Sequence, residues 1–127
     1  MYLYAKKRLF KAVYDFVKGI NPNWVGKGVK YPKIDLHTWI ENAPMDKEQG
    51  IREVSFIVEC YSNSSYEDAV SIADEVAEKL CNATWDIDGL EVISIVPENS
   101  EEIAEDDGNN IVIYRQLNRL VATIRNK

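Results

Sequence analysis

The 127-residue sequence contains few of the residues that usually carry chemistry, with two cysteines and one histidine. Cys60 and Cys81 lie outside any metal-type spacing, and so small a number favours reduced, buried thiols in a cytosolic protein over a disulfide. His37 is the sole histidine, and acid–base catalysis by it would require an orienting carboxylate, for which Asp35 is a candidate. A surface histidine without a chemical role is the simpler interpretation.

Long apolar runs and an excess of positive charge are also missing. No apolar segment approaches the roughly 20 residues that a membrane-spanning helix needs, so we expect no membrane partner. The first residues, "MYLYAKKRLFKAVYDFV", place lysines and an arginine among the apolar positions and lack a small-residue cleavage site, which is unlike a signal peptide. The formal net charge of -6 argues against a protein that binds DNA of any sequence through a basic surface.

Clusters of catalytic or metal-binding residues are likewise lacking. Asp86 and Asp88 lie close together, but a calcium loop requires further spaced carboxylates and a closing glutamate. The serines Ser62, Ser64 and Ser65 are explained as turn and capping residues, which leaves a small hydrolase built on the histidine without a nucleophile at a recognisable spacing. We therefore expect no enzymatic activity, no metal and no cofactor.

What the sequence does contain is enough apolar residues for one folded domain over residues 1–127, with a hydrophobic fraction of 46%. Helical spacing predicts a first helix over residues 2–18, which Gly19 and Pro22 should end. Its apolar arc is wider than one contact with a sheet requires, so the surplus is buried either against a second subunit or in a larger core. The residues of this arc are Leu3, Leu9, Phe10, Val13, Tyr14, Phe16 and Val17.

Alternating residues predict two strands that follow a turn-rich segment. The strand over residues 33–40 should place Ile34, Leu36 and Thr38 on one face, and a loop follows at residues 41–50. The strand over residues 54–61 divides into two sets of alternate residues, as in an antiparallel sheet with one covered face. One set is Val54, Phe56, Val58 and Cys60; the other is Ser55, Ile57, Glu59 and Tyr61.

A capped helix and two further strands complete the predicted order. Ser64 and Glu67 match a capping box, and an apolar stripe follows at Ala69, Ile72, Ala73, Val76, Ala77 and Leu80. Residues 90–97 read as a strand, residues 98–110 as an acidic mobile loop, and residues 111–124 as a last strand with a kink near 116–118. The order α-β-β-α-β-β predicts an α+β fold, a mainly antiparallel sheet with the helices packed on one face.

This order, with the "YP" strand and the segment "VECYSNSSYEDAVSIADEVAEKL", resembles the tail terminator and tail completion proteins of tailed bacteriophages. The resemblance covers nearly the whole chain and is carried most clearly by residues 54–80. It implies a structural phage or prophage protein without catalysis or cofactor, which forms a homo-oligomeric ring, commonly a hexamer. Such a ring caps the tail tube and joins it to the head connector, in the virion tail and, during assembly, in the host cytoplasm.

A closed ring requires two different, complementary surfaces on each subunit. We expect the acidic segment 98–107 of one subunit to approach the arginines near the C-terminus of the next, and the candidate interface residues are Glu101, Glu102, Glu105, Asp106, Asp107, Arg115, Arg119 and Arg125. DNA would only pass through the lumen, where negative walls disfavour phosphate contacts; the same net charge also serves solubility. The alternative function is a stand-alone protein-binding or regulatory module.

Overall fold

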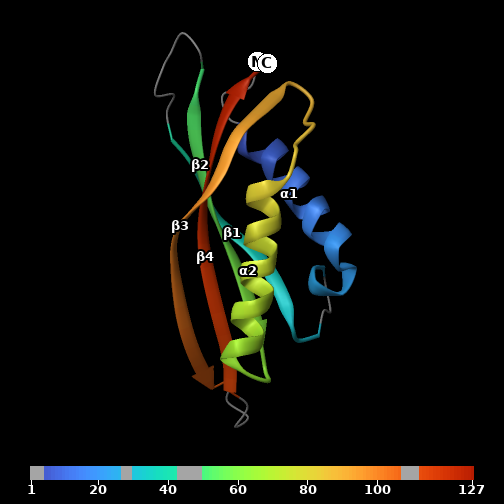
Figure 1. Cartoon of the computed structure of the whole chain (residues 1–127), viewed down its shortest axis with the longest axis vertical. Helices are drawn as coiled ribbons and strands as arrows, with labels where there is room; N and C mark the ends of the chain where they lie inside the picture. The colour runs from blue at the N-terminus through green and yellow to red at the C-terminus, as the bar shows by residue number, and fades with distance from the viewer. Residues whose placement is uncertain (1–4, 27–29, 43–49, 107–111) are drawn as a thin grey trace.

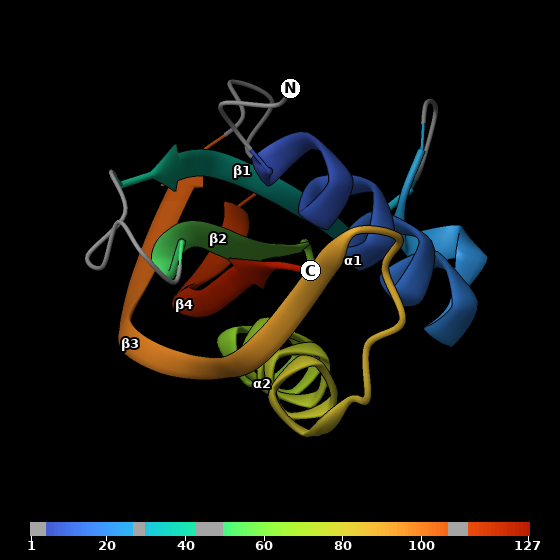
Figure 2. The same ribbon diagram turned by 90° about the horizontal axis from the view of Figure 1, so that it is seen from above.

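The computed structural model describes residues 5–26, 30–42, 50–106 and 112–127, and of residues 105 and 106 the backbone alone. Its elements follow the chain as α1 (Lys6–Ile20), a 3-10 turn η1 (Pro22–Trp24), β1 (Lys33–Glu41), β2 (Arg52–Ser62), α2 (Tyr66–Asn82), β3 (Leu90–Asp106) and β4 (Val112–Asn126). The strands form one antiparallel sheet in the order β1-β2-β4-β3. Both helices pack against the same face of this twisted sheet (Figures 1 and 2). The predicted α+β fold and element order are confirmed.

Helix α1 buries Leu9, Val13 and Val17, which recur every four residues along one face. The prediction that Gly19 ends this helix is wrong: the helix continues through Gly19 to Ile20, and Asn21, which precedes a proline, takes up an extended conformation instead. Leu3 lies outside the described residues. The remaining aromatic residues of the predicted arc are only partly buried, so part of that arc faces solvent.

The start of α1 is held by a residue of β1. Ala5 precedes the helix and provides no side-chain cap. Instead, Glu41 accepts hydrogen bonds from the backbone N–H groups of Ala5 and Lys6, each 2.8 Å long. Its second carboxylate oxygen accepts a bond of 2.8 Å from Arg52 Nη1, and the Glu41 side chain is only 1% exposed. A buried ion pair on the sheet therefore satisfies the positive end of the helix dipole.

Strand β1 changes face at a β-bulge. Thr38 has a φ of 56°, and the pairing of β1 with β2 shifts between His37 and Ile40. The bulge turns Trp39 onto the helix side, where its ring stacks on Phe56 at a centroid distance of 4.4 Å. Thr38, which the alternation placed on the buried face, is exposed. The predicted loop at 41–50 lies mostly outside the described residues.

Helix α2 begins one residue later than the capping-box prediction. Ser65, not Ser64, is the N-cap residue, and its hydroxyl accepts a 3.0 Å hydrogen bond from the N–H of Asp68. The predicted apolar stripe is confirmed, since Ala69, Ala73, Val76 and Leu80 are fully buried and the other two members pack at the edge of the core. The small alanines let the helix lie close to the strands beneath it.

Strands β3 and β4 form a long hairpin, and here two predictions are wrong. Residues 98–106 are not a loop: they continue β3 and pair with β4 as far as Asp106, opposite Val112. Bulges next to Val92 and Pro97 absorb the irregular pattern that suggested a strand end. The expected kink in β4 is absent from its described residues, which pair with β2 in one unbroken register. No described helix is long and apolar enough to cross a membrane.

Candidate assembly surfaces

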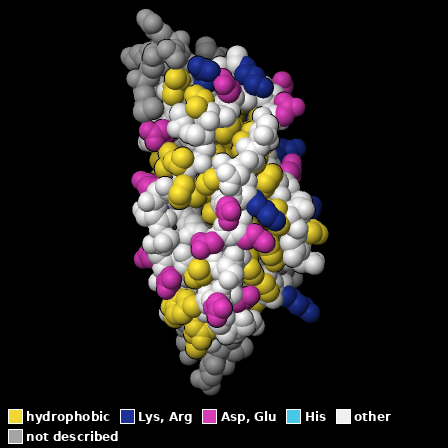
Figure 3. All heavy atoms as spheres, in the orientation of Figure 1, with side chains coloured by type: hydrophobic (Ala, Val, Ile, Leu, Met, Phe, Trp, Pro, Cys, Tyr) yellow, Lys and Arg dark blue, Asp and Glu magenta, His cyan; other side chains and the backbone are white. Residues whose placement is uncertain are grey.

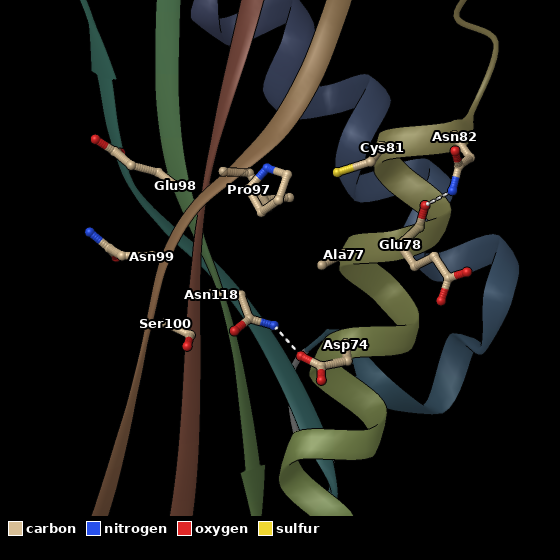
Figure 4. Close-up of a pocket in the computed structure, with 11 residues that line it drawn as sticks. Asp74, Ala77, Glu78, Cys81, Asn82, Pro97, Glu98, Asn99, Ser100 and Asn118 are labelled. Carbon is tan, nitrogen blue, oxygen red and sulfur yellow. Dashed lines mark hydrogen bonds between the residues drawn. The ribbon is translucent and has the colours of Figure 1, made fainter.

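A groove of about 630 Å³ runs between α2 and β3 (Figure 4). It forms because α2 lies over the central strands, so that the middle of β3 extends beyond the edge of the helix. Ala77 and Cys81 of α2 point toward β3, and the ring of Pro97 faces the helix (Figure 4). These side chains give the groove an apolar floor. The lining residues are Asp74, Ala77, Glu78, Cys81, Asn82, Pro97, Glu98, Asn99, Ser100, Asn118 and Leu120.

A short chain of hydrogen bonds connects β4 to α2 at this groove. The side-chain amide of Asn118 in β4 donates a 3.0 Å hydrogen bond to the Asp74 carboxylate. The side-chain amide of Gln116 donates a 2.9 Å hydrogen bond to Oδ1 of Asn118. Gln116 and Asn118 occupy two buried positions of the helix-facing side of β4, the positions that suggested a kink. These bonds link the two amides to each other and to Asp74, while Oε1 of Gln116 is buried without a hydrogen bond in the described part of the chain. The pairing of β4 with β2 continues through both positions. The described residues of the lining include three carboxylates and no lysine or arginine.

The two helices carry opposite charge. Helix α1 has five basic residues and one acidic residue, a net charge of +4, whereas α2 has five acidic residues and one basic residue, a net charge of -4. Strand β3 adds six acidic residues and no basic one. Lysine and arginine side chains accordingly gather along the side where α1 lies, and carboxylates lie over α2 and β3 (Figure 3). One subunit thus presents a basic and an acidic surface on the same layer.

The face of the sheet away from the helices contains a buried carboxylate. Glu59 of β2 has a side chain only 1% exposed; its Oε1 lies 2.6 Å from His37 Nε2, and its Oε2 accepts a hydrogen bond from Arg115. Tyr61 is next to this cluster, and burial, followed by the charge of Glu59, raises its pKa to about 12. The guanidinium of Arg115 lies over the Tyr61 ring, 5.3 Å from its centroid. The cluster binds three strands together through one desolvated carboxylate.

This cluster decides the role of the sole histidine. The carboxylate that orients His37 is Glu59, not Asp35, and the His37 side chain is 32% exposed, so it is neither a fully surface residue nor a buried one. Sequence reasoning missed Glu59 because its partner is 22 positions away along the chain. Asp86 and Asp88 stand without a third ligand: within the described ranges no group of three or more histidine, cysteine or carboxylate side chains is placed to hold a metal.

The predicted interface residues are placed as follows. Arg115 donates to Glu59, and Arg125 forms an ion pair of 2.7 Å with Glu91, so two of the three arginines already bind within their own chain. Arg119 is half-buried in β4. The acidic members lie in the neighbouring strand of the same subunit, where Glu101 and Glu102 are exposed; Asp107 is outside the described residues. Contact between these two groups across subunits stays a prediction.

Comparisons with known proteins place the fold. No protein-family model and no curated protein sequence matches this chain. Among solved structures, the chain is similar to one described as "Virion of native gene transfer agent (GTA) particle", with a TM-score of 0.78 and 12% sequence identity. The similarity covers 98% of this chain and 99% of that chain. At this identity the likeness shows that the two chains share a fold over their whole length.

Proposed function

We propose that the chain is a structural protein of a phage or prophage particle, which forms a homo-oligomeric ring, caps the tail tube and joins it to the head connector. The observation that carries the proposal is the end-to-end likeness to a chain of a virion, a TM-score of 0.78 with almost no residue of either chain left over. A shared fold alone does not define function. The sequence resemblance to tail terminator and tail completion proteins supports the same role.

The described surfaces agree with assembly in place of catalysis. The carboxylate that could activate His37 is itself held by Arg115, and in the α2–β3 groove the Asn118 amide is bonded to Asp74. Opposite charges on α1 and α2 provide the two different surfaces that a head-to-tail ring requires. In this role the protein performs no bond chemistry, and its partners are further copies of itself, the tail tube protein and the connector.

Electron microscopy tests the proposal. Purified protein, alone and mixed with isolated tail tubes, should give rings in projection and a cap at one end of each tube. Particles from a strain that lacks the gene should contain filled heads and unjoined tails, and the gene supplied in trans should restore joining. Bare tube ends after mixing, together with normal particles from the deletion strain, would contradict the proposal and favour a stand-alone binding module.

A further inference from the structure

The basic and acidic surfaces lie toward opposite edges of the sheet. Helix α1 contacts β1, which forms one edge, whereas α2 contacts the central strands β2 and β4 and also β3, which forms the other edge (Figure 2). In a head-to-tail assembly, one side of each subunit meets the opposite side of the next. The basic helix of one copy is therefore positioned to meet the acidic helix of its neighbour.

Charged residues on the two helices form rows on the solvent side. The basic row of α1 consists of Lys7, Lys11 and Lys18, all exposed. The acidic row of α2 consists of Glu67, Asp74 and Glu78, also all exposed. At about 100° per residue, each row occupies a strip roughly 40° wide on its helix. Within the described part of the chain, no ion pair joins the two rows or includes a row member, and Asp74 accepts the hydrogen bond from Asn118.

The spacings of the two rows match in one orientation only. In the basic row, Lys11 lies four residues after Lys7, and Lys18 lies seven residues after Lys11. In the acidic row, Asp74 lies four residues before Glu78, and Glu67 lies seven residues before Asp74. Each row therefore spans eleven residues, about 16 Å of helix. Parallel helices would leave the middle charges out of register by three residues, whereas antiparallel helices bring all three pairs level.

We propose that α1 of one copy packs antiparallel along α2 of a second copy, with the basic row facing the acidic row. The two helices of a single chain run in roughly opposite directions (Figure 1). A rotation about an axis parallel to the strands preserves that relation between neighbouring copies. The inference rests on the proposed function only in taking the neighbour to be another copy in the particle.

An aromatic side chain supports the same register. Phe10 lies beside the basic row of α1 and is 38% exposed. Ala77 and Cys81 lie beside the acidic row of α2, and about their helix axis they are displaced from that row in the same direction as Phe10 is from the basic row. When two antiparallel helices face each other, residues displaced in the same sense lie on the same side of the contact. Phe10 of one copy therefore reaches the apolar floor of the α2–β3 groove of the next, near Ala77.

Charge exchange between two variants tests this contact. The first variant is Lys7→Glu with Lys18→Glu; the second is Glu67→Lys with Glu78→Lys, and all four side chains are exposed. In sedimentation over a concentration series, wild-type protein should self-associate, and each variant alone should do so roughly 100-fold more weakly, because like charges then face each other. An equimolar mixture should recover association, since native α1 of one variant meets native α2 of the other.

A matched control separates this contact from net charge. Asp35→Lys with Asp86→Lys makes the same change in charge as the acidic-row variant, on exposed residues outside both rows and outside the candidate interface residues, and should associate as wild type does. Salt at 1 M should weaken wild-type association, because screening then acts within about 3 Å. Wild type that stays monomeric, a row variant that associates normally, or a mixture that stays apart overturns the inference. If the mixture of the two variants recovers association but the protein does not cap tail tubes, the contact between α1 and α2 is supported and the proposed function is contradicted.

Discussion

Glu41 provides the sharpest test of what holds α1 in place. We consider Glu41→Gln, which keeps the size of the side chain and removes its charge. The carboxylate accepts from Ala5 N–H, Lys6 N–H and Arg52 Nη1, each at 2.8 Å, and side-chain exposure is 1% for Glu41 and 8% for Arg52. One amide oxygen cannot replace two carboxylate oxygens, and the amide NH₂ group would face one of the three donors.

The expected loss in the free energy of unfolding is about 3–5 kcal/mol, the usual cost of removing one partner of a buried ion pair. A loss of this size is a large part of the roughly 5–15 kcal/mol that keeps a domain folded. It corresponds to a fall in Tm on the order of 10 °C or more for a chain of this length. Because two of the three donors belong to the start of α1, the basic row of that helix should also lose its fixed position.

Urea unfolding followed by circular dichroism measures this loss, and amide hydrogen exchange shows whether α1 opens before the sheet. Glu101→Gln makes the same chemical change at an exposed residue and should alter stability by no more than about 0.5 kcal/mol. If Glu41→Gln costs less than about 1 kcal/mol, or if α1 exchanges as slowly as in wild type, then the ion pair does not anchor the helix.

Four further predictions concern the two cysteines, Asp74 and Gly89. Burial raises the pKa of Cys60 to about 12 and raises that of Cys81, so both should resist alkylation at pH 8, with Cys81 modified first in mass spectrometry because only Cys60 is fully buried. The Cys60 thiol is the neutral form in the fold, so its contribution to stability is full below pH 9, its unfolded pKa, and declines as pH rises toward 12; a flat stability profile across that range would contradict this. Asp74→Ala removes the acceptor of the Asn118 amide and should lower the free energy of unfolding in urea by about 1–3 kcal/mol. A loss of no more than about 0.5 kcal/mol would show that water replaces the carboxylate as the acceptor. Gly89→Ala should cost at least about 1 kcal/mol, because φ at Gly89 is +72° and the added Cβ would lie 2.8 Å from an arginine side chain; an unchanged Tm would exclude that strain.

Local patterns in the sequence predicted the elements and the face of each that is buried. The alternation over residues 54–61 and the stripe in α2 led directly to buried sets that the structure contains. Ser64 was predicted as the cap because Glu67 follows it at capping-box spacing, whereas the backbone conformation makes Ser65 the N-cap residue. Residues 98–106 read as a loop because acidic residues are rare in strands, but β4 alongside supplies the hydrogen bonds that stabilise this edge strand.

The candidate assembly surfaces were only partly within reach of the sequence. The sequence alone contains the opposite charges of α1 and α2 and the matching spacings of their charged rows. Once the bounds of the two helices are known, no coordinates are needed to find them. Their placement at opposite edges of one layer required the strand order β1-β2-β4-β3. The arginines of β4 were chosen as interface residues from charge alone; the structure shows Arg115 and Arg125 bonded within their own chain.

The sequence by itself determined the α+β class, the order of the elements and the absence of a recognisable catalytic motif, because periodicity and capping act over a few neighbouring residues. Tertiary structure alone decided the bulge at Thr38, the ion pair between Glu41 and Arg52, and the partners of Glu59. Those features join residues from different strands, and a strand's neighbours depend on how the whole chain pairs. Spacing along a single element carries no record of that pairing.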